Sequence, residues 1–341
     1  MALPLAQHDP LEALVREVHA RPDADDARLV LADALLARGD PRGELIALQL
    51  AGAGDDRQRV RGEQLLREHG RRWLGALRPV AYRARFARGF LARLELNGRW
   101  TASELGWAAH RLDPQLATVE DLIPGRAVGP IYARFVTSPA MTALRRIEVF
   151  DRPTLEALRA TPARLVHVAC PRWKAGKYVH ELATHVLPAC RRFAELRSFA
   201  VHGDGVASVL ASSVLAQLTS LTVAGGLASG LALWPRLPRA LALTVARSAL
   251  LDDCATSRVA WTGSIELRRG DDGVIACASG AWLLGELVDH FAVLPAEVRR
   301  LEVEGAGDHA AALGAAAGRR GIELIVRPVA RRTGYVVGLD K

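Results

Sequence analysis

Two histidines flank a glutamate in the segment 180–185, His-Glu-Leu-Ala-Thr-His, which is the part of the chain most similar to a metalloprotease helix. In the zinc-protease motif the two histidines stand four residues apart, so that both lie on one face of a helix. Here His180 and His185 are five residues apart, which separates them by about 140° around an α-helix. The spacing therefore argues against a zinc site on this segment.

The cysteines are also poor metal ligands by spacing. His167 and Cys170 could join His185 and Cys190 around zinc, but the intervals match no standard zinc finger. We expect buried cysteines, ordinary histidines and no cofactor or metal. No two cysteines form a CxxC pair, which is typical of reduced thiols in a cytoplasmic protein. The four cysteines are Cys170, Cys190, Cys254 and Cys277.

Three further segments carry residues that occur in active sites or binding sites. The glycine-rich segment 225–230 lacks the order and the Lys-Ser/Thr ending of a phosphate-binding loop, so a turn explains it. Asp252-Asp253-Cys254 has no nearby base, and Arg331-Arg332 makes a weak footprint for nucleic acid. Because no nucleophile elbow or carboxylate pair stands out, we expect a protein that is not an enzyme.

Composition and charge support a soluble globular chain. Of the 341 residues half are hydrophobic, and the formal net charge is +8. Nearly all basic residues are arginines, and acidic residues are interspersed among them, so a nucleic-acid partner is not expected. The N-terminus has no signal-peptide pattern and no apolar run reaches the length of a membrane span. We expect a cytoplasmic protein with no membrane partner.

Residues 9–70 carry the start and stop signals of short helices. Asp9-Pro10 supplies an N-cap followed by proline at the first helical position, and Asp40-Pro41 repeats the pattern. A helix from Asp25 to Arg38 ends at Gly39, and another spans roughly Asp56 to His69. The segment predicts a small N-terminal helical domain.

Residues 28–49, RLVLADALLARGDPRGELIALQ, resemble the bacterial repeat-companion domain. Trp73-Leu74-Gly75 and Arg88-Gly89-Phe90 resemble the segment downstream of that domain in members that bear repeats, whereas Ala34 stands where the family usually has tryptophan. The resemblance implies a non-enzymatic accessory module, with no catalytic residues to carry over, followed by leucine-rich or other repeats.

A triplet of apolar residues at positions 1, 4 and 6 recurs from residue 90 onward. The central residues Phe199, Leu221, Leu243 and Ile265 follow one another at equal intervals of about 22 residues, within the range of leucine-rich repeats. A weaker copy is Ala163/Val166/Val168, and residues 321–326 suggest a closing strand. Longer intervals have room for helices at 179–187 and 281–291.

We therefore expect an α/β fold in which the helical domain (1–80) precedes an irregular leucine-rich-repeat-like solenoid with a parallel sheet (81–330) and a tail (331–341). The asparagine or cysteine usual at position 9 of a leucine-rich repeat is missing. A doubly wound α/β domain is the alternative fold.

Residues between the strand leucines should point to the exposed face of the sheet. There, arginines lie beside glutamates at both ends, with small residues between them. We expect this face to bind another protein, because arginine is enriched at interfaces. Alternatives are a solvated face whose charges pair, an enzyme or effector with a dispersed active site, and a nucleic-acid binder; the oligomeric state stays open. The predicted partner-binding residues are Arg145, Arg146, Glu148, Arg164, His167, Arg197, Thr222, Thr244 and Glu266.

Overall fold

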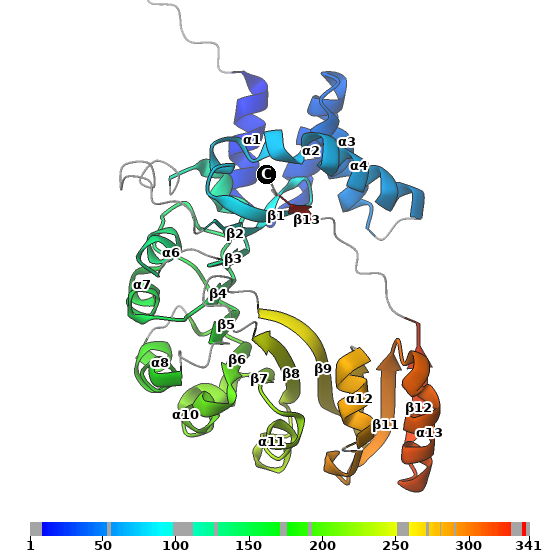
Figure 1. Cartoon of the computed structure of the whole chain (residues 1–341). Helices are drawn as coiled ribbons and strands as arrows, with labels where there is room; N and C mark the ends of the chain where they lie inside the picture. Colours follow the sequence, from blue (N-terminus) through cyan, green and yellow to red (C-terminus); the bar gives the residue numbers. More distant parts are fainter. Residues whose placement is uncertain are drawn as a thin grey trace, which may run out of the picture. The chain divides into compact units, whose positions relative to one another are not determined.

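The computed structural model describes residues 9–52, 56–97, 112–125, 129–170, 176–189, 193–250, 259–270, 273–279, 281–289, 291–328 and 336–338. It is a mixed α/β fold with an open, mostly parallel sheet (Figure 1). The chain forms two compact units, and each is described by itself. Unit 1 comprises residues 1–145, 160–164 and 333–341, and unit 2 comprises 146–159 and 165–332. Within the described residues, no helix is both long and apolar enough to cross a membrane.

Unit 1 begins with helices that confirm the predicted capping signals. Asp9 accepts a hydrogen bond from the Leu11 backbone N–H, and Asp40 accepts one from that of Arg42. Gly39, at φ +70°, follows the second helix in the left-handed conformation that glycine adopts readily. The helices are α1 (Pro10–Ala20), α2 (Asp25–Ala37), α3 (Pro41–Leu50) and α4 (Asp56–Trp73), followed by the 3₁₀ turn η1 (Gly75–Leu77).

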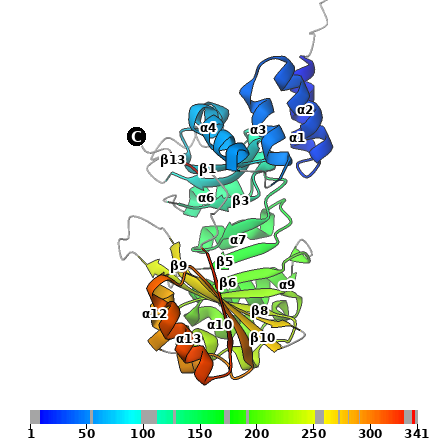
Figure 2. The ribbon, with the colours of Figure 1, turned by 90° about the vertical axis from the view of Figure 1, so that its right-hand side faces the viewer.

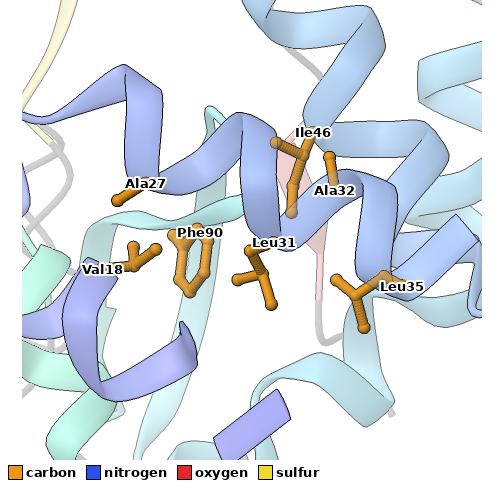
Figure 3. Packing of buried hydrophobic residues seen from close by; sticks show 7 residues of the cluster. All are labelled: Val18, Ala27, Leu31, Ala32, Leu35, Ile46 and Phe90. Atoms are coloured by element: carbon orange, nitrogen blue, oxygen red, sulfur yellow. The ribbon is translucent and has the colours of Figure 1, made fainter. Parts of the chain in front are cut away.

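The first three helices enclose an apolar cluster that also takes in the start of strand β2 (Phe90–Leu96). Figure 3 shows Phe90 between Val18 of α1 and Leu31 of α2, with Ile46 of α3 beyond. Burying a phenylalanine side chain contributes about 1.5–3 kcal/mol, so Phe90 is a substantial link between the helices and the strand. The remaining members of the cluster are Ala27, Ala32 and Leu35.

The sheet of unit 1 is built around the hairpin of β1 (Ala81–Ala87) and β2. Strand β3 (Asp121–Ile123) pairs in parallel with β2, and β13 (Val336–Gly338) pairs antiparallel with β1. The 3₁₀ turn η2 (Pro114–Thr118) and helix α6 (Gly129–Val136) complete the unit. Strand β13 lies in the predicted tail, and the domain boundaries predicted from sequence stay predictions.

Segment 28–49, on which the family resemblance rests, docks against the turn of this hairpin. Arg42 Nε donates to the Gly89 carbonyl at 3.1 Å, and its guanidinium lies 4.4 Å from the centre of the Phe90 ring. Gln49 accepts from the Gly89 N–H at 2.7 Å and donates to the Phe86 carbonyl. Gly89 has φ +77° and lies against Ile46, so a side chain there has no room. Several residues of the segment are therefore occupied by structural contacts.

In its described residues, unit 2 has nine strands in the order β12-β11-β10-β9-β8-β7-β6-β5-β4. Its strands are β4 (Arg146–Glu148), β5 (His167–Cys170), β6 (Ser198–His202), β7 (Ser220–Ala224), β8 (Ala242–Leu250), β9 (Val259–Gly270), β10 (Gly273–Ser279), β11 (Val298–Glu304) and β12 (Glu323–Arg327). Its helices are α7 (Arg152–Ala160), α8 (Gly176–Glu181), α9 (Leu187–Ala189), α10 (Val206–Leu210), α11 (Leu227–Leu231), α12 (Ala281–Asp289) and α13 (Ala310–Arg319), with α8 and α9 joined by a π-helical turn (Leu182–Val186).

Figure 1 shows helices α7, α8, α10 and α11 along one side of strands β4–β8, and Figure 2 shows the same strands after a quarter turn. Glycine permits close packing against these strands at two positions: a Cβ on Gly205 would lie 2.7 Å from Val201, and one on Gly230 would lie 2.6 Å from Val245. The described 3₁₀ turns in this unit are η6 (Gly203–Gly205), η7 (Ser213–Gln217), η8 (Trp234–Arg236), η9 (Phe291–Val293) and η10 (Gly307–His309).

The strand register confirms most of the apolar ladder predicted from sequence. Phe199, Leu221 and Leu243 are paired neighbours on β6, β7 and β8, and all are fully buried. Strand β12 confirms the closing strand, because it pairs in parallel with β11. Since side chains alternate along a strand, one face of this sheet is an apolar core face and the other carries the polar residues.

Two parts of the predicted ladder are wrong. Ile265 is opposite Val245, not Leu243, because β9 runs antiparallel to both β8 and β10. Alternation of apolar residues carries no strand direction, so equal spacing could not reveal the reversal. In β5 the central residue is Val168, not Val166, since Val168 pairs with Ile147 and Phe199.

We expect Gly43→Ala to destabilise unit 1 and Gly62→Ala to stabilise it. A Cβ at Gly43 would lie 2.7 Å from the Ala32 carbonyl oxygen and 2.8 Å from the Leu36 nitrogen, both backbone atoms. Crowding of this kind costs about 1–3 kcal/mol. A Cβ at Gly62, inside α4, would lie 3.9 Å from the Leu45 side chain, which is ordinary van der Waals contact, so alanine gains up to about 1 kcal/mol of helix propensity. Urea unfolding followed by circular dichroism measures both, and equal effects of the two substitutions would contradict the packing of α2 on α3.

Candidate functional site: the polar face of the sheet

Seven of the nine predicted binding residues belong to unit 2, and six of these lie on the strands of its polar face. We call the residues in register with Thr222 the central row, and those in register with Ser220 the flanking row. Glu148, Thr222, Thr244 and Glu266 belong to the central row, as predicted. The remaining positions of the central row are Ala169, Ala200, Cys277, Glu302 and Ile325.

His167 occupies a different place from the one predicted. It pairs with Arg146 on β4 and Ser198 on β6, so it lies in the flanking row, and Ala169 takes the expected position beside Glu148. This displacement of His167 follows from the error in β5, where the central residue is Val168 instead of the predicted Val166. Arg197 precedes β6, and its guanidinium donates to the Ala194 and Leu196 carbonyls of its own turn. Both Arg197 and Arg146 are exposed, but the guanidinium of Arg197 is engaged within its own turn.

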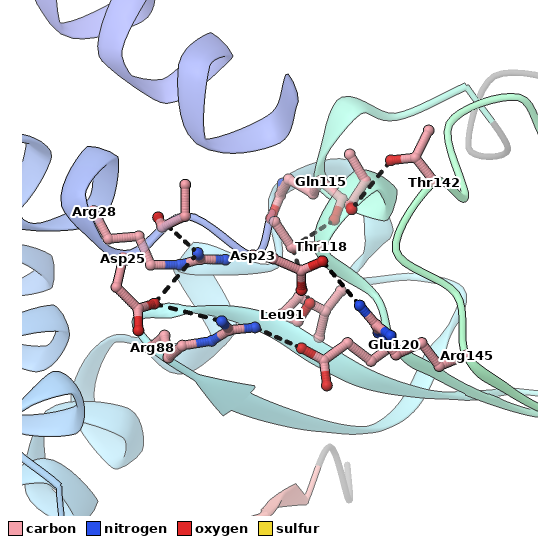
Figure 4. A network of polar contacts seen from close by, with 12 residues as sticks. Asp23, Asp25, Arg28, Arg88, Leu91, Gln115, Thr118, Glu120, Thr142 and Arg145 are labelled. Carbon is pink, nitrogen blue, oxygen red and sulfur yellow. Dashed lines mark hydrogen bonds and ion pairs between the residues drawn. The ribbon is translucent and has the colours of Figure 1, made fainter. Parts of the chain in front are cut away.

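The other two predicted residues, Arg145 and Arg164, belong to unit 1. Arg145 forms an ion pair with Asp23 at 2.8 Å. Nearby, Arg88 contacts both Asp25 and Glu120, while the fully buried Arg28 donates to the Ala24 carbonyl (Figure 4). These contacts tie the start of α2 to the hairpin and to the strand β3 region. Arg145 is thus part of a structural ion-pair network.

A chain of hydrogen bonds runs along the flanking row. The Ser220 hydroxyl donates to Ser198 Oγ at 2.8 Å, and Ser198 Oγ lies 2.9 Å from His167 Nδ1. Burial lowers the pKa of His167 to about 4, and the neighbouring Arg146 adds to this effect. His167 is therefore neutral at pH 7, when Nδ1 can accept the Ser198 proton. The sequence indicated His167, but its serine partners became visible only with the strand register.

The polar face is hollowed where strands β9, β10, β11 and β12 meet. The hollow has a volume of about 290 Å³, and it is lined by Glu266, Cys277, Glu302, Glu304 and Arg327 among others. Glu266 pairs with Arg268 at 2.6 Å, and Glu302 pairs with Arg327 at 3.0 Å. Because these two glutamates form ion pairs with arginines, their negative charges are largely neutralised, and the hollow is not simply an acidic pocket.

The two described cysteines are not suited to nucleophilic chemistry. Burial raises the pKa of Cys277, and the adjacent Glu302 and Glu266 raise it further. Cys170 lies on the core face, and burial raises its pKa far above the usual range. A nucleophilic cysteine requires a lowered pKa. Cys190, Cys254, Asp252-Asp253 and Arg331-Arg332 lie outside the described residues.

The separation expected between His180 and His185 is wrong. A π-helical turn at Leu182–Val186 underwinds the helix there, and the two imidazole rings stand 6.0 Å apart at their centres. The intervening Glu181 is bound by Arg152 and Arg159. In the described part of the chain, no three histidine, cysteine or acidic side chains are grouped to hold a metal ion.

Comparisons of this chain with family models, with curated proteins and with solved structures found no match.

The pH dependence of stability tests the environment of His167. Its pKa is about 4 in the folded chain, against an ordinary value near 6.5. Between these values the unfolded chain binds more protons, so the free energy of unfolding is complete above about pH 6.5 and falls as the pH decreases toward 4. We expect His167→Gln to reduce this pH dependence, by up to about 1.4 kcal/mol per pH unit.

NMR titration of the His167 imidazole gives the pKa directly. Titration of His167 near pH 6.5 would contradict its placement in the hydrogen-bonded row.

Proposed function

We propose that the protein is a non-enzymatic scaffold that binds another protein on the polar face of unit 2. The observation that carries the proposal is the composition of the central row. On β6–β8 it consists of Ala200, Thr222 and Thr244, which form a floor of small side chains. Toward each end stand charged residues, Glu148 on one side and Glu266 on the other.

The floor has a physical role in such an interface. Ala200 is buried, whereas Thr222 and Thr244 are half-buried, so their hydroxyl groups are within reach of a partner. Small side chains lose little conformational entropy when a partner covers them. Arg146, which is exposed, can then form an ion pair at the rim, where charges contribute more to specificity than to affinity.

We further propose that the regular part of unit 2 is a leucine-rich-repeat-like solenoid and that the N-terminal helices form a repeat-companion domain. Strands β6, β7 and β8 lie in consecutive parallel order, with a short helix after β6 and another after β7, and this arrangement supports the first statement. The docking of segment 28–49 on the β1–β2 hairpin supports the second, because it accounts for residues shared with that family. The proposal places the protein in the cytoplasm of a bacterium.

The second candidate function is an enzyme, and one observation favours it. Ser198 hydrogen bonds to a neutral histidine, as a nucleophilic serine does with its general base. However, the group facing His167 on the next strand is Arg146, whereas a serine hydrolase orients its histidine with a carboxylate. The scaffold proposal therefore accounts for more of this face.

Site-specific photo-crosslinking tests the scaffold proposal. With a photoreactive residue at Thr222 or Thr244, we expect a discrete crosslinked protein in cells, insensitive to nuclease. Thr222→Arg combined with Thr244→Arg should abolish capture from a reporter at Ser220, because two large charged side chains then fill the floor.

The control reporter stands at Ser229, which is exposed on α11. Equal crosslinking from Ser229 and Thr222 would refute a binding site on the polar face. A Ser198→Ala variant that keeps the crosslink would separate the scaffold from the hydrolase, since alanine removes the hydroxyl group and leaves the floor intact.

A further inference from the structure

Strand β12 ends the strand order of unit 2 and has a paired neighbour, β11, on one side. The Arg327 carbonyl accepts a hydrogen bond from the Gly305 N–H, so the backbone groups of Arg327 point toward β11. In a parallel strand the backbone groups of successive residues point to alternate sides. Those of Leu324 and Val326 therefore point away from β11, toward the edge.

Among the described residues, this strand contains no lysine, proline or bulge, which are features that keep exposed edges from pairing. Its charged residues, Glu323 and Arg327, stand at its two ends. The sequence of β12 is Glu-Leu-Ile-Val-Arg, its register with β11 is regular, and Pro328 comes only after its last residue. Val326 is 49% exposed, which is unusual for a large apolar side chain in the described part of this chain.

The same sequence is complementary to itself in the antiparallel direction. If a second copy pairs about a two-fold axis at Ile325, Leu324 stands opposite Val326 of that copy and Glu323 opposite its Arg327. Leu324 and Val326 then exchange backbone hydrogen bonds as antiparallel pairs do. Glu323 and Arg327 fall in the closer, non-hydrogen-bonded pairs, where opposite charges stabilise the sheet.

Charges already present in the chain extend this pattern. Glu323 pairs with Arg300 at 2.8 Å, and Arg327 pairs with Glu302 at 3.0 Å. In the paired arrangement the order across the junction is Arg300, Glu323, then Arg327 and Glu302 of the second copy. Positive and negative charges therefore alternate across the junction, and no two like charges are neighbours in this row.

Helix α13, which packs on β12, is suited to a close neighbour. A surface helix normally presents charged residues to solvent. The exposed positions of α13 before its last residue are instead small and uncharged: Ala311, Ala312, Ala315 and Gly318.

We propose that β12 is a homodimerisation edge, at which two copies of the chain join antiparallel about Ile325 into one continuous sheet. The occupant is a second copy rather than a different protein, because the charges at both ends of β12 complement their own two-fold image. This inference is independent of the function proposed for the polar face.

The test uses the full chain in analytical ultracentrifugation over a concentration series. We expect the wild-type protein to associate into a dimer of the 36.7 kDa chain. Glu323→Arg and Arg327→Glu should each weaken self-association at least tenfold, because each places like charges opposite one another twice. An equimolar mixture of the two variants should form a heterodimer, since every facing pair is again opposite in charge.

The double variant Glu323→Arg/Arg327→Glu should also regain self-association, because the pairs that face each other across the junction are again opposite in charge, although the ion pairs with Arg300 and Glu302 within each copy are lost. This outcome separates the interface from the stability of the monomer. Val326→Pro is a further probe, because it removes an N–H that points to the edge and leaves the bonds to β11 in place. A wild-type chain that stays monomeric, or a dimer indifferent to these substitutions, would overturn the proposal.

Discussion

The fold of unit 2 depends on keeping one apolar row in register from strand to strand. Phe199, Leu221 and Leu243 stand side by side and are fully buried, and the next residues on the same face, Val201, Val223 and Val245, form a second row. A shift of one residue in any strand would turn its apolar residues to the opposite face. The helices cover this face, so the polar face is free to vary in composition.

The reversal at β9 satisfies the same constraint with a different topology. Leu267 remains opposite Leu243, and Ile265 remains opposite Val245, although the chain direction has changed. Strand β10 runs antiparallel to β9 and so restores the original strand direction, and β11 and β12 continue parallel to β10. The apolar rows thus run unbroken through an antiparallel hairpin. On the polar face the hairpin brings Glu266, Cys277 and Glu302 together, a combination that a strictly parallel array would not produce.

Sequence reasoning therefore predicted what local chemistry determines. Proline, glycine and aspartate marked the ends of α1–α3, and apolar alternation located β6, β7, β8, β11 and β12. It failed where the answer depended on pairing: the direction of β9, the register of β5, and the serine partners of His167. The π-helical turn at Leu182–Val186 was also missed, because no residue type in the segment specifies it. Pairing is a long-range property, and alternation within one strand does not encode it.

The distribution of structural roles indicates where functional residues should be sought. Arg42, Gln49 and Gly89 are occupied in holding α3 to the β1–β2 turn, and substitution there would disturb the fold before it revealed a function. Arg145 and Arg197, chosen from sequence as anchors for a partner, are similarly engaged with Asp23 and with nearby carbonyl groups. Thr222 and Thr244, in contrast, are half-buried on the polar face, in the middle of the central row. Polar residues that stability does not require are the ones whose identity is free to serve recognition, so these two threonines are better guides to function than the more conspicuous arginines.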